Sequence, residues 1–252
     1  MRKHFPVMND RPETPQVILG YIFAILSFWT LPFLMMVFVH DSLQNTAAVT
    51  WGEIIYHVIN FAAVVYLFHE YLGESFFNVD YKPKKFIAVT ATCAGLMIGL
   101  AVVAFLIYYF TGSFIAYSLV FNSSPLAEME LFTISGNVIY ESPIWGTICM
   151  VLIVPFTTSL IYYATGFAPT CNKRPWLAYP LVALFIAVPR IFNAVTFWDP
   201  AEELTLYLSQ LPFHLISCWG YEKADSVWAP IFAHMVFNLF SAIMILILRF
   251  IQ

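Results

Sequence analysis

Seven apolar runs, separated by short polar stretches, divide this chain of 252 residues. Most of them reach the roughly 20 residues that a helix needs to cross the hydrocarbon core of a bilayer. The sixth run is the shortest and is interrupted by Gln210, Pro212 and His214. The runs are Val17 to Val39, Ala48 to Leu72, Phe86 to Phe110, Ser142 to Thr165, Trp176 to Phe197, Glu203 to Trp219 and Val227 to Arg249. This pattern predicts an all-α fold, a polytopic transmembrane helical bundle with about seven spans.

The composition supports this prediction, since 61% of the residues are hydrophobic and only 10% are charged. A soluble domain carries about 25% charged residues and could not cover its surface with so few. The partners expected from composition are therefore the lipid bilayer and other membrane components, and no basic cluster indicates nucleic acid. The four cysteines lack metal-ligand spacing and are expected to be small buried hydrophobes.

The runs divide the chain into three parts. Residues 1–16 form a polar segment, 17–141 hold the N-terminal transmembrane helices and an outer loop, and 142–252 form a core bundle. The first run is longer than the apolar part of a signal peptide and lacks a small-residue cleavage site after it. We therefore expect it to remain as a membrane anchor, with a kink at Pro32.

The lysines and arginines gather in alternate loops, which predicts the orientation by the positive-inside rule. With seven spans and a cytoplasmic N-terminus, the inside loops collect all the basic loop residues and the outside loops collect none. These residues are Arg2, Lys3, Arg11, Lys82, Lys84, Lys85, Lys173, Arg174 and Lys223. The predicted localisation is a multi-pass cell-membrane protein with an extracytoplasmic C-terminus.

Two polar residues, His234 and Asn238, interrupt the last apolar run. They are four residues apart and therefore share one face of a helix. Polar side chains within hydrocarbon are costly unless they face protein, so the pair predicts a functional site. The alternative is a single interhelical hydrogen bond that holds two helices together.

The predicted orientation places further polar residues near the level of His234, which lies roughly 10 Å from the cytoplasmic edge. Thr158 and Ser159 lie at a similar depth in the fourth run, and His214 does so in the sixth. Four polar side chains from three helices are thus expected in one layer. We take His214, His234 and Asn238 as candidate binding residues.

Arg190 and Asn193 lie deeper, in the fifth run, and are further candidate binding residues. A buried arginine needs a partner, and Glu202 and Glu203 are the nearest acids beyond the loop. The alternative is that Arg190 extends outward to the interface.

In the second run, Glu53 and His57 form an i, i+4 pair. We expect both to be interfacial, with a proton relay as the lesser alternative.

Three segments resemble the CPBP family of CAAX proteases and bacteriocin-processing intramembrane proteases. The sequence EKADSVWAPIFAHMVFN, which ends at Asn238, is similar to the closing family signature, in which a charged loop precedes His-x-x-x-Asn. The sequence VPFTTSLIYYATG resembles the Pro-x-x-Glu-Glu-x-x-Phe-Arg-Gly stretch in position and framing. The sequence PWLAYPLVALFIAVPR is similar to the segment that leads to Phe-x-x-x-His. On this resemblance, His234 and Asn238 are the family's histidine and asparagine.

The departures from the family decide what the resemblance implies about activity. Thr158 and Ser159 stand where the family has its glutamate pair, Tyr163 stands where it has arginine, and Pro189 or Arg190 replaces its second histidine. In that family a glutamate is taken to activate water, while the histidines and asparagine stabilise the oxyanion or bind metal. Hydroxyl groups do not ionise near neutral pH and cannot replace a carboxylate base. The resemblance therefore favours a pseudoenzyme with no confidently assigned catalytic residue.

Three functions follow from these residues. The first is a catalytically degenerate CPBP-like protein that binds a membrane-protein partner, or a lipid-linked ligand, as a scaffolding subunit of the bacterial envelope, without cofactor or metal. The second is an active endopeptidase with a rearranged site at His214 and His234, which is the alternative that would use zinc. The third is a transporter or channel, for which the sequence shows no internal repeat and no paired half-helices.

The orientation can be tested with reporter fusions. A topology reporter fused after residue 252 should give an extracytoplasmic signal, while one fused before residue 12 should give a cytoplasmic signal, because the basic loops hold the inside positions. A cytoplasmic C-terminal reporter would contradict the predicted topology.

Overall fold

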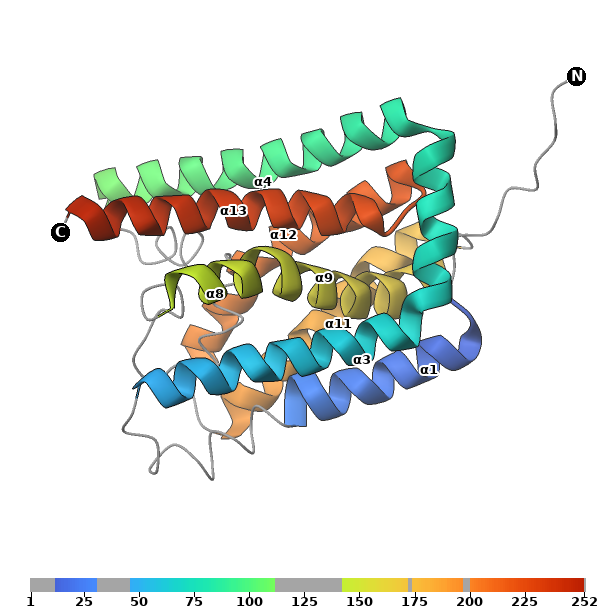
Figure 1. The fold of residues 1–252 in the computed structure, drawn as a ribbon, viewed down its shortest axis with the longest axis horizontal. Coiled ribbons are helices and arrows are strands. Elements are labelled where there is room, and N and C mark those ends of the chain that lie inside the picture. The colour runs from blue at the N-terminus through green and yellow to red at the C-terminus, as the bar shows by residue number, and fades with distance from the viewer. Residues whose placement is uncertain (1–11, 31–45, 112–141, 172–173, 197–199, 252) are drawn as a thin grey trace, which may run out of the picture.

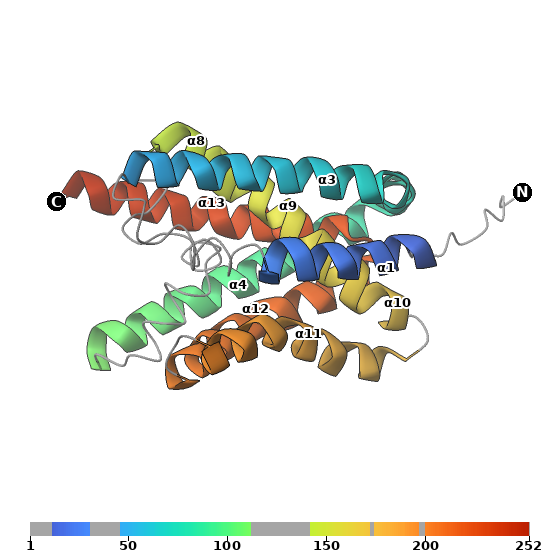
Figure 2. The same ribbon diagram turned by 90° about the horizontal axis from the view of Figure 1, so that it is seen from below.

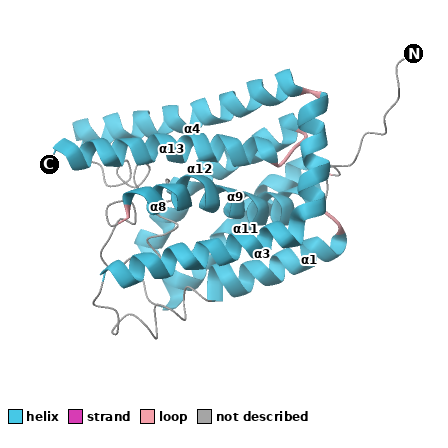
Figure 3. Cartoon of the chain, viewed as in Figure 1, coloured by secondary structure: helices cyan, strands magenta, loops and turns pink. Residues whose placement is uncertain are grey.

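The computed structural model describes residues 12–30, 46–111, 142–171, 174–196 and 200–251. Within these ranges every element is a helix, and Figure 3 shows only helices and short loops there. Most of the helices run roughly along one direction and form a bundle, with α3, α8, α9 and α13 stacked in the view of Figure 1. The predicted all-α bundle is confirmed for this part of the chain.

Seven helical segments follow one another in the described ranges. The fourth is a composite of α-helical and π-helical pieces that continue one another. The segments are α1 (Thr14–Phe23) with η1 (Ala24–Thr30), α3 (Thr46–Tyr81), α4 (Pro83–Thr111), then α8 (Pro143–Ile148) with η2 (Cys149–Ile153), α9 (Val154–Ser159), η3 (Leu160–Phe167) and α10 (Ala168–Cys171), and finally α11 (Pro175–Thr196), α12 (Pro200–Ala224) and α13 (Trp228–Ile251).

Three of these segments are long and apolar enough to cross a membrane by length and composition. They are Ile54–Tyr81, Pro83–Thr111 and Pro143–Cys171. Shorter apolar stretches lie at Thr14–Ser27, Pro175–Val188 and Trp228–Ile243. The chain is therefore a membrane protein with several apolar helices. The kink expected at Pro32 falls outside the described residues.

Two segments differ from their predicted extents. The predicted second run ends at Leu72 and a charged turn follows, but α3 continues to Tyr81. Only Lys82 separates it from α4, which begins at Pro83. Figure 1 shows α3 turning sharply so that its last part crosses the end of the bundle. The sixth run was expected to be short and interrupted, but α12 is continuous over 25 residues, with Pro212 inside it. Both segments thus stay helical in the folded protein, despite the charged turn predicted after Leu72 and despite Pro212.

The composite helix from Pro143 to Cys171 is the centre of the bundle. In its most apolar window 67% of the residues are buried, against 33% for Ile54–Tyr81 and 28% for Pro83–Thr111. It packs against α1, α3, α11 and α13, and Figures 1 and 2 both place α9 close to α3 and α13. A helix surrounded by other helices, and not by lipid, can tolerate irregular hydrogen bonding.

The start of α13 is held by α3. The Val227 N–H donates to Ser75 Oγ at 3.0 Å, and Ser75 Oγ lies 2.9 Å from Ser226 Oγ. The Trp228 N–H donates to Ser226 Oγ at 3.3 Å, and Trp228 Nε1 donates to the Leu72 carbonyl at 3.0 Å. These bonds satisfy donors that a helix start leaves unpaired. They also fix the position from which the rest of α13 extends into the bundle.

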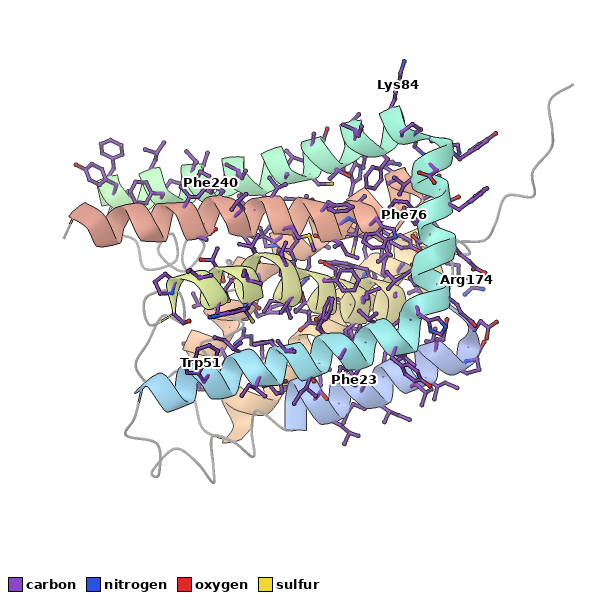
Figure 4. All side chains as sticks on the ribbon, in the orientation of Figure 1. Phe23, Trp51, Phe76, Lys84, Arg174 and Phe240 are labelled. Carbon is purple, nitrogen blue, oxygen red and sulfur yellow. The ribbon has the colours of Figure 1, made fainter. Side chains whose placement is uncertain are left out.

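Two of the described basic residues that were assigned to inside loops, Lys84 and Arg174, lie near this same end. Figure 4 shows both at the end of the bundle where α3 turns, with Phe76 beside them, while Trp51 lies toward the opposite end. Lys85 Nζ also pairs with Asp225 Oδ2 at 3.1 Å. The orientation of this end relative to the membrane stays a prediction.

A glycine in α1 allows that helix to approach the composite helix closely. A methyl group at Gly20 would collide with Thr165 Oγ1 and would lie 3.1 Å from Phe68 Cζ. We expect Gly20→Ala to destabilise the protein by about 1–3 kcal/mol through overpacking. Gly95→Ala is the matched control, since nothing lies within 4 Å of its added methyl group and alanine favours helix. Thermal unfolding in detergent should show a lower midpoint only for Gly20→Ala; equal midpoints would contradict this contact.

Candidate functional site

The polar pair of α13 faces the interior of the bundle. His234 is 9% exposed and Asn238 is 2% exposed, whereas Phe232, Val236 and Leu239 on other faces of α13 are exposed. This arrangement agrees with the expectation that both polar side chains avoid lipid. The exposed apolar side chains on the outer face of α13 are the ones that can contact hydrocarbon.

Asn238 hydrogen bonds to the backbone carbonyl of Met150 in η2. In this π-helical turn the Val154 N–H donates to the Cys149 carbonyl, five residues back, and so leaves the Met150 carbonyl without its usual donor. Pro155 follows and has no N–H to replace it. Asn238 Nδ2 supplies the missing hydrogen bond at 2.7 Å. The Asn238 amide nitrogen thus bonds to a backbone carbonyl and not to one of the polar side chains that were expected in the same layer.

The two hydroxyls at the family's glutamate positions are buried in the composite helix. Thr158 Oγ1 donates to the Val154 carbonyl of its own helix at 2.8 Å. Ser159 Oγ is buried and has no hydrogen-bond partner among the residues described. Threonine in a helix commonly bonds to the carbonyl four residues back. The Thr158 hydroxyl is therefore directed at the backbone.

His214 of α12 lies among aromatic side chains of η3. Tyr163 Oη is 3.0 Å from His214 Nδ1, and the Tyr162 ring lies edge-on to the imidazole at 4.9 Å between centroids. His234 and Arg190 lie within electrostatic range of His214. Tyr163 was noted in the sequence only as a departure from the family, yet it is a direct partner of His214.

Arg190 forms a buried ion pair with Glu203. Arg190 Nη1 lies 3.5 Å from Glu203 Oε2, and both side chains are less than a tenth exposed. Glu203 was one of the two predicted partners, and the alternative that Arg190 extends outward was wrong. Glu203 lies eleven residues before His214 in α12, roughly 16 Å along the helix axis. The side chains of Asn193, Glu202 and Glu53 lie outside the described residues.

His57 differs from the prediction of an interfacial side chain, since it is buried at 6% exposure. Asn60, one turn later, is buried at 4% exposure and was not considered in the sequence analysis. Both lie on the face of α3 that also buries Ile54, Val64 and Phe68. The spacing of these residues along α3 could have indicated that they share the inward face.

The described residues offer no set of ligands for a metal ion. No group of three or more histidine, cysteine, aspartate or glutamate side chains gathers among them. The described part of the chain thus does not fit a zinc centre at His214 and His234.

Glu222, at the end of α12, is held at the edge of the bundle. Tyr179 Oη donates to Glu222 Oε2 at 2.7 Å, and Lys223 Nζ lies 3.1 Å from Glu222 Oε1. The tyrosine hydrogen bond lowers the pKa of Glu222, with Lys223 adding to the effect against a partial desolvation. Glu222 is therefore ionised and engaged at this edge.

Comparison with protein families identifies the core of the chain. Residues 140–240 match the family described as type II CAAX prenyl endopeptidase Rce1-like. Over this stretch the match supports a place in the CAAX-protease family, in agreement with the resemblance of the closing His-x-x-x-Asn motif. Comparisons with the curated proteins and with the solved structures gave no match. The apolar helices and this match together indicate a membrane protein that is similar to the CAAX proteases over residues 140–240.

The hydrogen bond between Asn238 and Met150 can be tested by removing and then replacing its donor. Asn238→Leu leaves the Met150 carbonyl unpaired, so we expect a loss of about 1–3 kcal/mol of stability. Pro155→Ala adds an N–H that can donate to Met150 in the π-helical register, so the double variant should recover part of this loss. Thermal unfolding of the two single variants and the double variant gives the comparison. Strictly additive effects would contradict the proposed exchange of donors.

Proposed function

We propose that this protein is a catalytically degenerate member of the CAAX-protease type that binds another membrane protein as a scaffolding subunit of the bacterial cell envelope. The observation that carries the proposal is the composition of the layer around His234. No carboxylate among the described residues contacts His234, and the family's glutamate positions hold Thr158 and Ser159.

The need for a carboxylate follows from the chemistry of amide hydrolysis. Water must lose a proton as it attacks, and a positioned general base contributes about 10²–10⁴ in rate. The Thr158 hydroxyl cannot act as this base, because it does not ionise near neutral pH and already donates to the Val154 carbonyl. Ser159 Oγ has no described group to take its proton.

Two of the described carboxylates, Glu203 and Glu222, are engaged elsewhere. Glu203 pairs with Arg190 beyond His214, and Glu222 bonds Tyr179 and Lys223 at the edge of the bundle. The neighbouring histidines could in principle orient water, which is the basis of the alternative, an endopeptidase with a rearranged site at His214 and His234. No described carboxylate contacts His234, the imidazole on which that alternative depends most.

The partner-binding part of the proposal rests on ordered structural features that do not depend on catalysis. Specific hydrogen bonds hold the His-x-x-x-Asn helix against the composite helix and fix the start of α13 through Ser75 and Ser226.

Affinity purification of the tagged protein from native membranes should recover a membrane protein in a fixed ratio. Recovery of lipid and detergent alone, across several mild detergents, would contradict a scaffolding role.

The absence of hydrolysis can be measured directly. We expect no cleavage of CAAX-type prenylated peptides or transmembrane peptides by the purified protein, with or without added zinc, because the site lacks a base. His234→Ala is the matched control. Cleavage by the wild-type protein that disappears in His234→Ala would contradict the proposal and establish the rearranged endopeptidase site.

A further inference from the structure

The last part of α3, which follows the turn of that helix, crosses the end of the bundle (Figures 1 and 2). Its inner side is fixed against the start of α13. The Leu72 carbonyl accepts from Trp228 Nε1 at 3.0 Å, and Ser75 Oγ accepts from the Val227 N–H at 3.0 Å. Val79 packs against a buried cluster that lies where α4 and α13 begin and α12 ends. One side of this part of α3 is therefore covered by the bundle.

The opposite side carries four exposed residues, Glu74, Phe77, Asp80 and Tyr81. Successive side chains of an α-helix are rotated by about 100°, so these four lie within roughly a third of the circumference and face away from Ser75. Phe77 is 50% exposed and Tyr81 is 63% exposed. We call these four residues the α3 end face.

Lipid does not account for the two exposed aromatic rings of the α3 end face. Helices that cross a bilayer run close to its normal, tilted by about 20° on average, so the end of a bundle faces headgroups and water. Because the last part of α3 crosses that end, its outer side is turned away from the hydrocarbon. Large apolar side chains that are exposed on such a surface and rimmed by polar residues are typical of a protein interaction site.

The charged residues of the α3 end face indicate the chemistry of a partner. Glu74 and Asp80 lie beside the two rings and form no hydrogen bond or ion pair with another described residue. Lys82 Nζ lies 5.8 Å from the centroid of the Tyr81 ring, which is within the range of a cation–π interaction. The face thus combines two carboxylates with a ring that accepts an ammonium group. It is complementary to lysine or arginine side chains on a partly apolar segment.

The basic residues that follow the α3 end face in the sequence are directed elsewhere. Lys85 Nζ is paired with Asp225 Oδ2 at 3.1 Å, and Figure 4 shows Lys84 pointing away from the bundle. This end of the bundle is the one that the positive-inside rule predicts to be cytoplasmic. By the same rule, other membrane proteins carry lysine and arginine next to their spans on that side. A neighbouring membrane protein therefore brings positive charge to the level of this face.

We propose that the α3 end face binds the basic cytoplasmic segment that adjoins a transmembrane span of a partner protein. Phe77 and Tyr81 cover the apolar side chains of that segment. Glu74 and Asp80 pair with its lysines or arginines. The inference rests on the proposed partner-binding function, and it names the surface and the chemistry by which the partner is held.

The test uses three soluble peptides of defined composition. The first is built from lysine, leucine and glycine, the second has glutamate in place of each lysine, and the third has serine in place of each leucine. Fluorescence anisotropy of each labelled peptide is measured with the full-length protein in phosphatidylcholine nanodiscs, which carry no net charge, and empty nanodiscs serve as the blank.

The wild-type protein should prefer the lysine–leucine peptide. We expect its affinity to exceed that for the glutamate peptide by about 2- to 25-fold, as two exposed ion pairs allow, and to fall when salt is added. The serine peptide should also bind more weakly, because it offers the two rings no apolar contact. Equal affinity for the lysine–leucine and glutamate peptides would overturn the inference.

Reversing the charge of the α3 end face should reverse this preference. The double variant Glu74→Lys with Asp80→Lys should bind the glutamate peptide more tightly than the lysine–leucine peptide. An unchanged preference for lysine in this variant would overturn the inference.

The aromatic rings are tested separately. Phe77→Ala and Tyr81→Ala should each weaken binding of the lysine–leucine peptide about 5-fold or more, as truncation of an interface anchor does. Tyr109→Ala is the matched control, since Tyr109 is 72% exposed but lies at the other end of α4, and it should keep wild-type affinity. Wild-type affinity in both end-face variants, the result expected if the rings sit among lipid headgroups, would overturn the inference.

Thermal unfolding without peptide separates a binding role from a structural one. Phe77→Ala and Tyr81→Ala should keep or slightly raise the wild-type midpoint, because both rings are exposed and alanine favours helix. A lowered midpoint in both variants would show that the fold uses the rings, and would overturn the inference. Cleavage of transmembrane or prenylated peptides would contradict the proposed function alone, whereas a missing peptide preference without cleavage would contradict only this surface.

Discussion

The hydrogen bond from Asn238 to the Met150 carbonyl is the constraint around which the described core is organised. In hydrocarbon each backbone polar group needs an internal partner, and an irregular helix survives only where other protein surrounds it. The π-helical turn and Pro155 together leave the Met150 carbonyl without a donor from its own helix. The central position of the composite helix, and the nearness of α13 to it, both follow from this requirement. The bonds from Ser75 to the start of α13 then set how far along its axis Asn238 lies.

Much of the fold could be predicted from apolar periodicity and charge, because both are properties of local sequence. The apolar runs located the helices, and the paired spacing of His234 and Asn238 indicated an inward face. The register of the composite helix could not be predicted, because π-helical turns depend on what packs around them. His57 was misplaced for a related reason. Its neighbour Glu53 indicated an interface, while the burial of α3 against the composite helix determines its environment.

Hydroxyl side chains at positions 158 and 159, where the family resemblance places a glutamate pair, are compatible with a stable fold. A buried glutamate must be paired or protonated, since an isolated charge in a low-dielectric interior is costly. Threonine at position 158 avoids this cost by bonding to the Val154 carbonyl, so the helix accommodates it without a partner elsewhere. Replacement of the family's arginine by Tyr163 is consistent with this change. The tyrosine hydroxyl contacts His214 without introducing a positive charge that the missing glutamates would have balanced.

The buried charges of α11 and α12 form an ion pair within the described residues, and its contribution to the fold differs from that of Asn238. Arg190 and Glu203 neutralise each other, so the pair adds no net charge to the described interior. A buried ion pair gives little net stability, because desolvation offsets most of the attraction. The contact between α13 and the composite helix uses an uncharged group instead, since the Asn238 amide donates to the Met150 carbonyl. That hydrogen bond avoids the desolvation of a charge and satisfies a backbone carbonyl that would otherwise be buried without a donor.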